Sequence, residues 1–244
     1  AFVVRAWKVR YKQTVIGATW AIIQPVALMI VFSVFFGLLI RVPSGDLPYP
    51  VFVYCGLLVW QYFSRAFSDA AMSVVTNAHI VTKIYFPRML LPIASVIAAL
   101  PEFLFSLLAL VLLMLYYQVS PGWQILLVPF FVVAAVLIAL AVGLIFGSVY
   151  VLFRDVAQLL PFTIQLWMFL TPIIYPATLV PETVRWIYYL NPMAMVVEGA
   201  RWGFAGSAPP ELANIGLGVF TMCLLMVFGV FMFRRLEPKF GESI

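Results

Sequence analysis

The sequence predicts an all-α polytopic membrane protein with six transmembrane helices in a single domain, residues 1–244. Its composition is 65% hydrophobic and only 9% charged, with a mean hydropathy of +1.11, whereas soluble proteins carry about 25% charged residues. Apolar runs long enough to cross about 30 Å of hydrocarbon also recur along the chain. The two cysteines, Cys55 and Cys223, lie inside apolar runs. They predict neither a disulfide framework nor a metal site.

The first element is a basic amphipathic segment. On a helical wheel over residues 2–12, basic side chains gather on one face and apolar side chains on the other, with only Arg10 out of place. A helix of this kind lies on an anionic membrane surface. We therefore expect residues 1–18 to form an interfacial helix, with its charge supplied by Arg5, Lys8, Arg10 and Lys12.

Six apolar runs follow, and each is long enough to span the bilayer. The predicted spans are 20–40, 51–76, 89–117, 123–152, 159–177 and 211–233. In the fourth, Gly143 and Gly147 have the spacing that lets two helix backbones approach closely. The partner of this surface is either another helix of the same chain or a second subunit.

The basic residues predict that both termini are cytoplasmic, because Lys and Arg accumulate on that side. This topology places three basic residues outside: Arg41, Arg185 and Arg201. It places ten inside: Arg5, Lys8, Arg10, Lys12, Lys83, Arg88, Arg154, Arg234, Arg235 and Lys239. The opposite topology would expose the C-terminal basic cluster on the outer face.

One external connection is long. Pro181, Asn191-Pro192 and Pro209-Pro210 delimit two short segments, 183–190 and 193–205. Neither is long enough to span. The region 183–205 therefore predicts two short periplasmic helices, re-entrant or interfacial, before the last span.

Three ionisable residues fall inside predicted spans, where each is a candidate functional group because charge in lipid costs a few kcal/mol. Arg65 and Asp69 are four residues apart and can pair on one helix face. We favour a structural pair over a transport role. Glu102 follows Pro101, which can kink the third span. Its alternatives are structural pairing and a place along a substrate path.

Motifs for catalysis are absent from the sequence. It has no GxxxxGK[ST] phosphate loop, HExxH, GxSxG or CxxC. The only histidine, His79, lies in a predicted internal loop without a ligand cluster. The basic residues lie beside apolar runs, which argues against nucleic-acid binding despite the net charge of +5. We expect no enzyme activity, no bound metal and no cofactor in this chain.

Aromatic residues make up 16% of the chain, and many fall near the predicted outer surface. They are typical of the interfacial belt of a membrane protein. Alternatively, some line a path for sugar, because an aromatic face packs against a pyranose ring. The candidates are Tyr54, Trp60, Tyr62, Tyr175, Trp186, Tyr189 and Trp202.

Four ordered segments carry a resemblance to a known family. They are RYKQTVIGATWAIIQP (10–25), PYPVFVYCGLLVW (48–60), NAHIVTKIYFPR (77–88) and YYLNPMAMVVEGARWGFAG (188–206). Together they resemble the permease subunit of bacterial ATP-binding-cassette exporters for polysaccharide, which move O-antigen, capsule or teichoic acid polymers. The resemblance covers nearly the whole chain, in order and in topology.

The resemblance implies a homodimer in the bacterial inner membrane. Two copies of a separate nucleotide-binding subunit would use ATP and Mg²⁺. The loop 78–88 would be the coupling loop that docks on this ATPase, with His79, Lys83, Tyr85, Phe86 and Arg88 as candidate contacts. The interfacial helix 1–18 would lie beside it. Its basic residues would meet either anionic membrane lipids or the diphosphate of a lipid-linked polysaccharide.

Two other classes remain as alternatives. An ion-coupled secondary transporter needs membrane carboxyl groups, and Glu102 is the one fair candidate. A membrane glycosyltransferase or polymerase needs clustered acidic or histidine groups, which the sequence does not contain.

Overall fold

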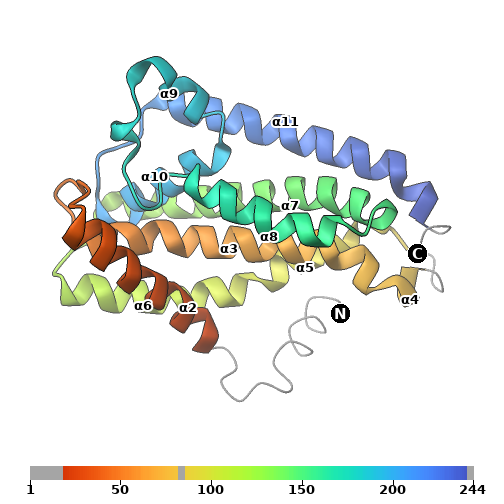
Figure 1. The fold of residues 1–244 in the computed structure, drawn as a ribbon, viewed down its shortest axis with the longest axis horizontal. Coiled ribbons are helices and arrows are strands. Elements are labelled where there is room, and N and C mark those ends of the chain that lie inside the picture. The colour runs from red at the N-terminus through yellow and green to blue at the C-terminus, as the bar shows by residue number, and fades with distance from the viewer. Residues whose placement is uncertain (1–18, 82–85, 241–244) are drawn as a thin grey trace.

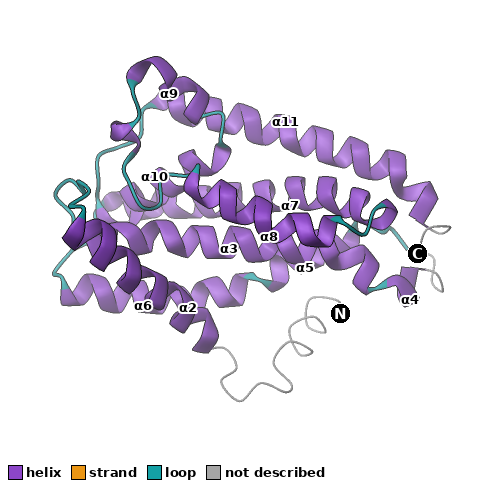
Figure 2. Ribbon diagram, in the orientation of Figure 1, coloured by secondary structure: helices purple, strands orange, loops and turns teal. Residues whose placement is uncertain are grey.

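The computed structural model describes residues 19–81 and 86–240, and these residues form helices joined by loops, with no strand (Figures 1 and 2). This confirms the all-α prediction for the described part. The predicted interfacial helix 1–18 and residues Lys83 and Tyr85 of the predicted coupling loop lie outside the described residues.

Helix α3, Tyr49–Thr76, is the central element, and other helices lie around it (Figure 1). Of its 28 residues, 19 are buried. Its neighbours include α2 (Trp20–Phe32), α7 (Val128–Leu152) and α10 (Pro192–Ala205). Because α3 packs against protein on most sides, it tolerates Arg65 and Asp69 better than a lipid-facing helix would.

The remaining long helices are more apolar. Within the described residues, four segments are long and apolar enough to cross a membrane: Trp20–Leu39, Leu90–Tyr116, Trp123–Leu152 and Leu212–Lys239. The first joins α2 to a π-helical stretch, Ser33–Leu39. The third joins a 3₁₀ turn, Trp123–Leu127, to α7. The fourth joins α11, Leu212–Leu236, to a 3₁₀ turn, Glu237–Lys239. The prediction of six spans remains a prediction.

The third predicted span, 89–117, has a break at Ala99. Helix α5, Leu90–Ala98, ends there, and α6, Leu100–Tyr116, begins immediately afterwards. Pro101 occupies the first turn of α6, where its missing N–H is tolerated. The break follows from this proline, as the sequence predicts.

The fifth predicted span, 159–177, extends beyond the observed helix. Helix α8 covers only Val156–Phe169 and is followed by an irregular segment. Pro172 explains this difference, because a proline disfavours helical backbone at the residue before it. Hydropathy alone does not reveal this end, since the segment after Phe169 is still largely apolar.

Helix α7 packs closely on two neighbours through glycines. A Cβ added at Gly143 would lie 2.5 Å from the Cβ of Ala70 on α3, and one added at Gly147 would lie 3.1 Å from the Ala71 carbonyl oxygen. From the other neighbour, a Cβ added at Gly229 of α11 would lie 2.5 Å from the Ala141 carbonyl oxygen. The small-residue surface of the fourth span therefore packs within the chain.

The connections gather at two opposite ends of the bundle (Figure 1). One end holds α4, Ala78–Val81, together with the turn 153–155 and the end of α11. The other holds the loops 40–48 and 117–122 and the short helix α9, Glu182–Tyr188. Helix α10 starts near α9 and is buried against α3 and α7. The region 183–205 thus contains two short helices, whose placement outside the membrane remains a prediction.

Candidate functional site

A cavity with a partly polar lining lies among α2, α3, α6 and α8. Its volume is about 550 Å³. Helix α3 contributes the stretch between Leu58 and Ser68, and α2 contributes residues from Trp20 to Leu28. The start of α6 and the middle of α8 complete the lining. A cavity with this lining is unusual within an apolar bundle, because polar groups facing lipid lack hydrogen-bond partners.

Three glutamines supply much of the polar lining. Gln24 comes from α2, Gln61 from α3 and Gln165 from α8. In residues 19–81 and 86–240, their side-chain amides make no hydrogen bond. An amide both donates and accepts hydrogen bonds. Three helices therefore place glutamine residues without side-chain hydrogen bonds at one cavity, where a hydroxyl-rich molecule can bind.

The ionisable residues predicted within the membrane also meet here. Arg65 and Glu102 both line the cavity. Arg65 Nε lies 3.3 Å from Asp69 Oδ2, so the predicted pair on α3 is present. The Arg65 side chain is 49% exposed, and Glu102 is half-buried. The structure thus brings together three groups that the sequence places in two different spans.

Hydrogen bonds from α3 and α6 hold the cavity walls in place. Tyr54 Oη donates to the Ser106 carbonyl oxygen at 3.1 Å, and Tyr62 Oη donates to the Val96 carbonyl oxygen at 3.2 Å. Ser106 Oγ in turn donates to the Ala21 carbonyl oxygen of α2 at 2.6 Å. These bonds fix the positions of α2, α5 and α6 around α3.

Helix α8 is held through the start of α10. Asn191 caps α10 by accepting the Met193 N–H at 3.0 Å. The same oxygen accepts the Trp167 indole N–H at 2.8 Å, and the Asn191 amide donates to the Thr171 hydroxyl at 2.9 Å. The ring of Trp167 also packs edge-on against Phe63 of α3. One asparagine therefore ends α8 and starts α10.

The predicted sugar-path aromatics divide into three groups. Trp60 and Tyr62 line the cavity, although each is almost fully buried. Tyr54 is buried behind the wall. The remaining four, which do not line it, are Tyr175, Trp186, Tyr189 and Trp202. Trp20 of α2 also lines the cavity and is 55% exposed.

Arg201 of α10 forms a buried junction with α3 and the segment after α8. Its guanidinium lies 3.5 Å above the ring centroid of Phe52. Nε donates to the Phe52 carbonyl oxygen at 3.2 Å, while Nη2 donates to those of Pro172 and Ile173 at 2.8 and 3.2 Å. Burial lowers the pKa of Arg201 to about 10, so it stays charged at neutral pH. This cation ties together three segments that are distant in sequence.

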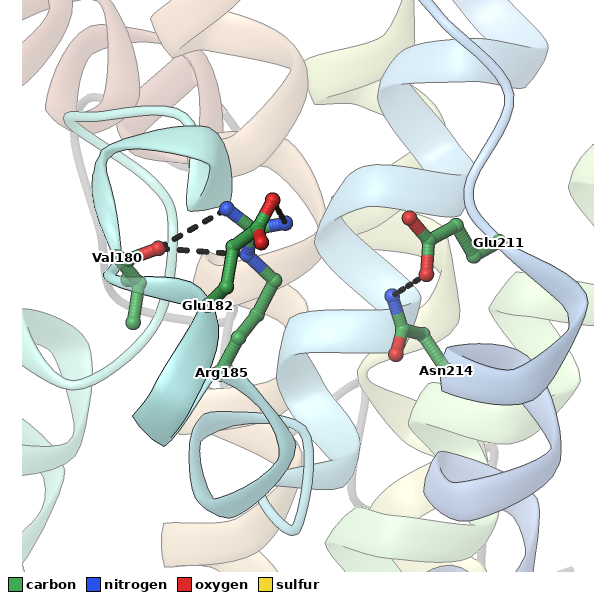
Figure 3. Close-up of polar contacts among 5 residues, drawn as sticks. All are labelled: Val180, Glu182, Arg185, Glu211 and Asn214. Carbon is green, nitrogen blue, oxygen red and sulfur yellow. Dashed lines mark hydrogen bonds and ion pairs between the residues drawn. The ribbon is translucent and has the colours of Figure 1, made fainter.

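The end of the bundle that holds α9 carries a second polar cluster. Tyr189 Oη donates to the Glu198 carboxyl group. Burial raises the pKa of Glu198, and the hydrogen bond from Tyr189 opposes this shift. Arg185 Nη2 donates to the Val180 carbonyl oxygen at 3.1 Å, which closes the turn before α9 (Figure 3). Nearby, Asn214 donates to Glu211 at the start of α11 (Figure 3).

At the opposite end, the predicted coupling loop is attached to the end of α11. Arg88 Nη1 donates to the Glu237 carbonyl oxygen. Its guanidinium lies 6.0 Å from the centroid of the Phe240 ring. Phe86 packs against the small apolar cluster that contains Phe233 and Phe240, whereas His79 is exposed. The predicted residues Arg5, Lys8, Arg10, Lys12, Lys83 and Tyr85 lie outside the described residues.

Within residues 19–81 and 86–240, the arrangement of side chains does not point to a metal site. No three His, Cys, Asp or Glu side chains come together there in a way that could hold an ion.

Two features of the site escaped sequence reasoning. The first is the set of Gln24, Gln61 and Gln165, which are not among the residues predicted from the sequence. An uncharged amide within an apolar run is the signal that could have found them. Arg201 falls on the outer side in the predicted short helix 193–205, and its burial is not predicted. Its position among apolar and small residues in MVVEGARWGFA (195–205) was a signal of burial.

Comparison with known proteins gives a consistent result over nearly the whole chain. Residues 1–205 match the family model described as ABC-2 type transporter. The O-antigen export system permease protein RfbA of Klebsiella pneumoniae is 29% identical over 97% of this chain and 91% of its own length. RfbA of Myxococcus xanthus is 28% identical over 100% of this chain and 94% of its own length. The polysialic acid transport protein KpsM of Escherichia coli is 26% identical over 100% and 95%. The family match and the four apolar helices identify a multi-pass membrane protein.

Proposed function

Because the chain belongs to the ABC-2 type transporter family, and resembles polysaccharide exporter permeases within it, we propose that it forms the channel of an ATP-driven exporter. Its substrate would be a lipid-linked polysaccharide of O-antigen type. ATP and Mg²⁺ would be used by two copies of a separate nucleotide-binding subunit, and this chain would hold no cofactor. Capsule or teichoic acid polymer is the alternative cargo.

The cavity with its amide and hydroxyl groups is the single observation that carries this proposal. Its amides and hydroxyls match the hydroxyl groups of a sugar, since both partners donate and accept hydrogen bonds. Trp20 adds an exposed aromatic surface to the wall, and an aromatic face packs against the apolar face of a pyranose. Two of the relatives are named for O-antigen export and for polysialic acid transport.

We propose that the working unit is a homodimer. The cavity is bordered by α2 and α8, which both pack on α3. Exposed apolar side chains on α8, including Phe162 and Leu166, continue this border. A polar cavity open to hydrocarbon would leave its amides without partners. A second copy placed against α2 and α8 would enclose the path, while membrane lipids would cover the remaining apolar surface.

The proposed topology has six spans in the bacterial inner membrane with both termini in the cytoplasm. The fourteen-residue α8 would be the shortest span, and α3 would be the least hydrophobic one. The separation of the connections into two ends supports this arrangement. On this topology α9 and α10 lie at the periplasmic end, where Trp186, Tyr189, Tyr175 and Trp202 would border the exit.

The loop 78–88 is the proposed ATPase-coupling element, with contacts from His79, Lys83, Tyr85, Phe86 and Arg88. The anchoring of Phe86 and Arg88 on the end of α11 supports this role. A loop that is fixed to two helices can transmit a movement of the ATPase to the helix bundle. The basic segment with Arg5, Lys8, Arg10 and Lys12 would lie at the inner surface, near the lipid diphosphate of the substrate.

An ion-coupled secondary transporter is the second candidate, and one observation favours it. Glu102 lines the cavity, and carboxyl groups within membrane spans often mark ion pathways in transporters. ATP dependence separates the two mechanisms. An ion gradient would drive export by a secondary transporter in the absence of any ATPase.

Narrowing the cavity tests the proposed path. Ser68 lines the cavity, and Ser68→Trp should fill part of it with an indole ring. We expect polymer delivery to the cell surface to fall at least about tenfold, because the passage is blocked at its wall. The assay measures surface polymer in cells that contain the chain and its ATPase subunit.

The matched control is Cys223→Trp. Cys223 is exposed on α11 and does not line the cavity. This variant should export normally, and both variants should accumulate in the membrane at the wild-type level. Unimpaired export by Ser68→Trp would remove the cavity from the transport path.

A further inference from the structure

We propose that the cavity is selective for uncharged sugar units and disfavours polyanionic polymers. The inference rests on the proposed function of the same cavity and concerns the repeating units, not the lipid anchor. It distinguishes between the kinds of cargo that the relatives' names mention, O-antigen and polysialic acid.

The charge of the lining is the first argument. Among the described residues that line the cavity, the charged side chains are Arg65 and Glu102, one of each sign. Arg65 is further neutralised by Asp69, whose carboxylate oxygen lies 3.3 Å from its Nε. The described lining therefore brings no net positive charge to an anionic unit.

The neutral polar groups are the second argument. Gln24, Gln61 and Gln165 reach the cavity from three different helices. The amide group of each glutamine pairs fully with a hydroxyl, because it has both donors and an acceptor. A carboxylate offers acceptors alone, so it uses the NH₂ group and meets the amide oxygen unfavourably. Ser64 and Ser68 extend the same neutral chemistry along α3.

Desolvation makes this difference matter. A charged group that leaves water for a low-dielectric site must find a paired countercharge there. A polymer with a carboxylate on every unit would meet this requirement again with each unit that passes. A neutral polymer exchanges hydrogen bonds with water for hydrogen bonds with amides, with no charge to neutralise. The cavity chemistry therefore favours the neutral polymer.

The experiment compares two polymers on the same carrier. The full chain and its ATPase subunit are reconstituted in vesicles that contain a polyprenyl-diphosphate-linked neutral polyhexose or polysialic acid of equal length. We expect ATP-dependent translocation of the neutral polymer to be at least about tenfold faster. Equal rates, or faster movement of polysialic acid, would overturn the selectivity and leave the proposed function intact. If neither polymer moves, the proposed function fails and the selectivity fails with it.

A charge variant provides the second arm. Gln165→Lys adds a cation to the lining, so the rate ratio of neutral to anionic polymer should fall at least about fivefold. Gln158→Lys is the matched control, because Gln158 is exposed on the same helix and does not line the cavity. It should keep the wild-type ratio. Gln24→Lys repeats the test from α2. Unchanged ratios in both cavity variants would contradict the inference.

Discussion

Arg201 illustrates how a single residue can organise the end of the bundle where α9 and α10 lie. Its guanidinium stacks on Phe52 and donates to three backbone carbonyl oxygens. A compact ammonium group could not reproduce this planar contact, which makes Arg and Lys unequal here. The residue fixes the segment after α8 against α3 and α10, and therefore helps to set the position of a cavity wall.

Replacing this arginine tests its role. Arg201→Met should lower the free energy of unfolding by about 3 kcal/mol, because it leaves buried carbonyl groups without their charged donor. The free energy of unfolding of Arg201→Lys should lie between those of Arg201→Met and the wild type. Thermal unfolding of the purified chain in detergent measures the change.

Arg41→Met serves as the control, since Arg41 is exposed in the loop 40–48. Its effect should stay within about 0.5 kcal/mol. Equal loss of stability in Arg41→Met and Arg201→Met would contradict the role assigned to the buried junction.

The sequence identifies individual residues unevenly. The pairing of Arg65 with Asp69 follows from their spacing on one helix, so it could be predicted. The meeting of Glu102 with Arg65 at the cavity could not, because it depends on how α6 packs on α3. The glutamine lining is likewise a tertiary property. Each amide is unremarkable in its own helix, and only packing brings the three together.

At the scale of elements, glycines set the distance between α7 and its neighbours. Gly229 lets the backbone of α11 approach Ala141 of α7. Gly216, on the same helix, faces open space, with no atom within 4 Å of an added Cβ. The two positions therefore separate helix propensity from close packing.

A pair of alanine substitutions uses this contrast. Gly229→Ala should destabilise the chain by about 1–3 kcal/mol, because the new methyl group forces α11 away from α7. Gly216→Ala should be neutral or stabilising by up to about 1 kcal/mol, since alanine favours helix. Unfolding of both variants in the same detergent gives the comparison. A similar shift for the two would show that α11 does not depend on this approach.

Helices and their breaks can be predicted from the sequence where a long apolar run or a proline marks them. The break before α6 follows from Pro101, and the long apolar runs become helices. The end of α8 at Phe169 does not follow from hydropathy, because residues 170–177 are still largely apolar. Some of their backbone carbonyl groups accept hydrogen bonds from side chains of other segments instead of from the helix. The side chains of Asn191 and Arg201 donate hydrogen bonds to carbonyl oxygens of this segment, those of Leu170 and Pro172 respectively. Such tertiary hydrogen bonding leaves no periodic trace in the sequence.

At the scale of the whole molecule, a cavity with polar groups lies inside a bundle whose exterior is largely apolar. The chain buries α3 and exposes apolar side chains along α2, α6, α8 and α11. Lipid or a second copy must cover these surfaces. Because the chain belongs to the ABC-2 type transporter family, a separate ATPase subunit is the expected energy source. The cavity is the route that we propose for the sugar polymer.

The most direct measurement is translocation of a lipid-linked polysaccharide by the purified chain reconstituted in vesicles, with and without its ATPase subunit. We predict transport only when both subunits and ATP with Mg²⁺ are present, and no response to a proton or sodium gradient. Transport driven by an ion gradient without the ATPase would contradict the account. So would polymer synthesis by the chain alone.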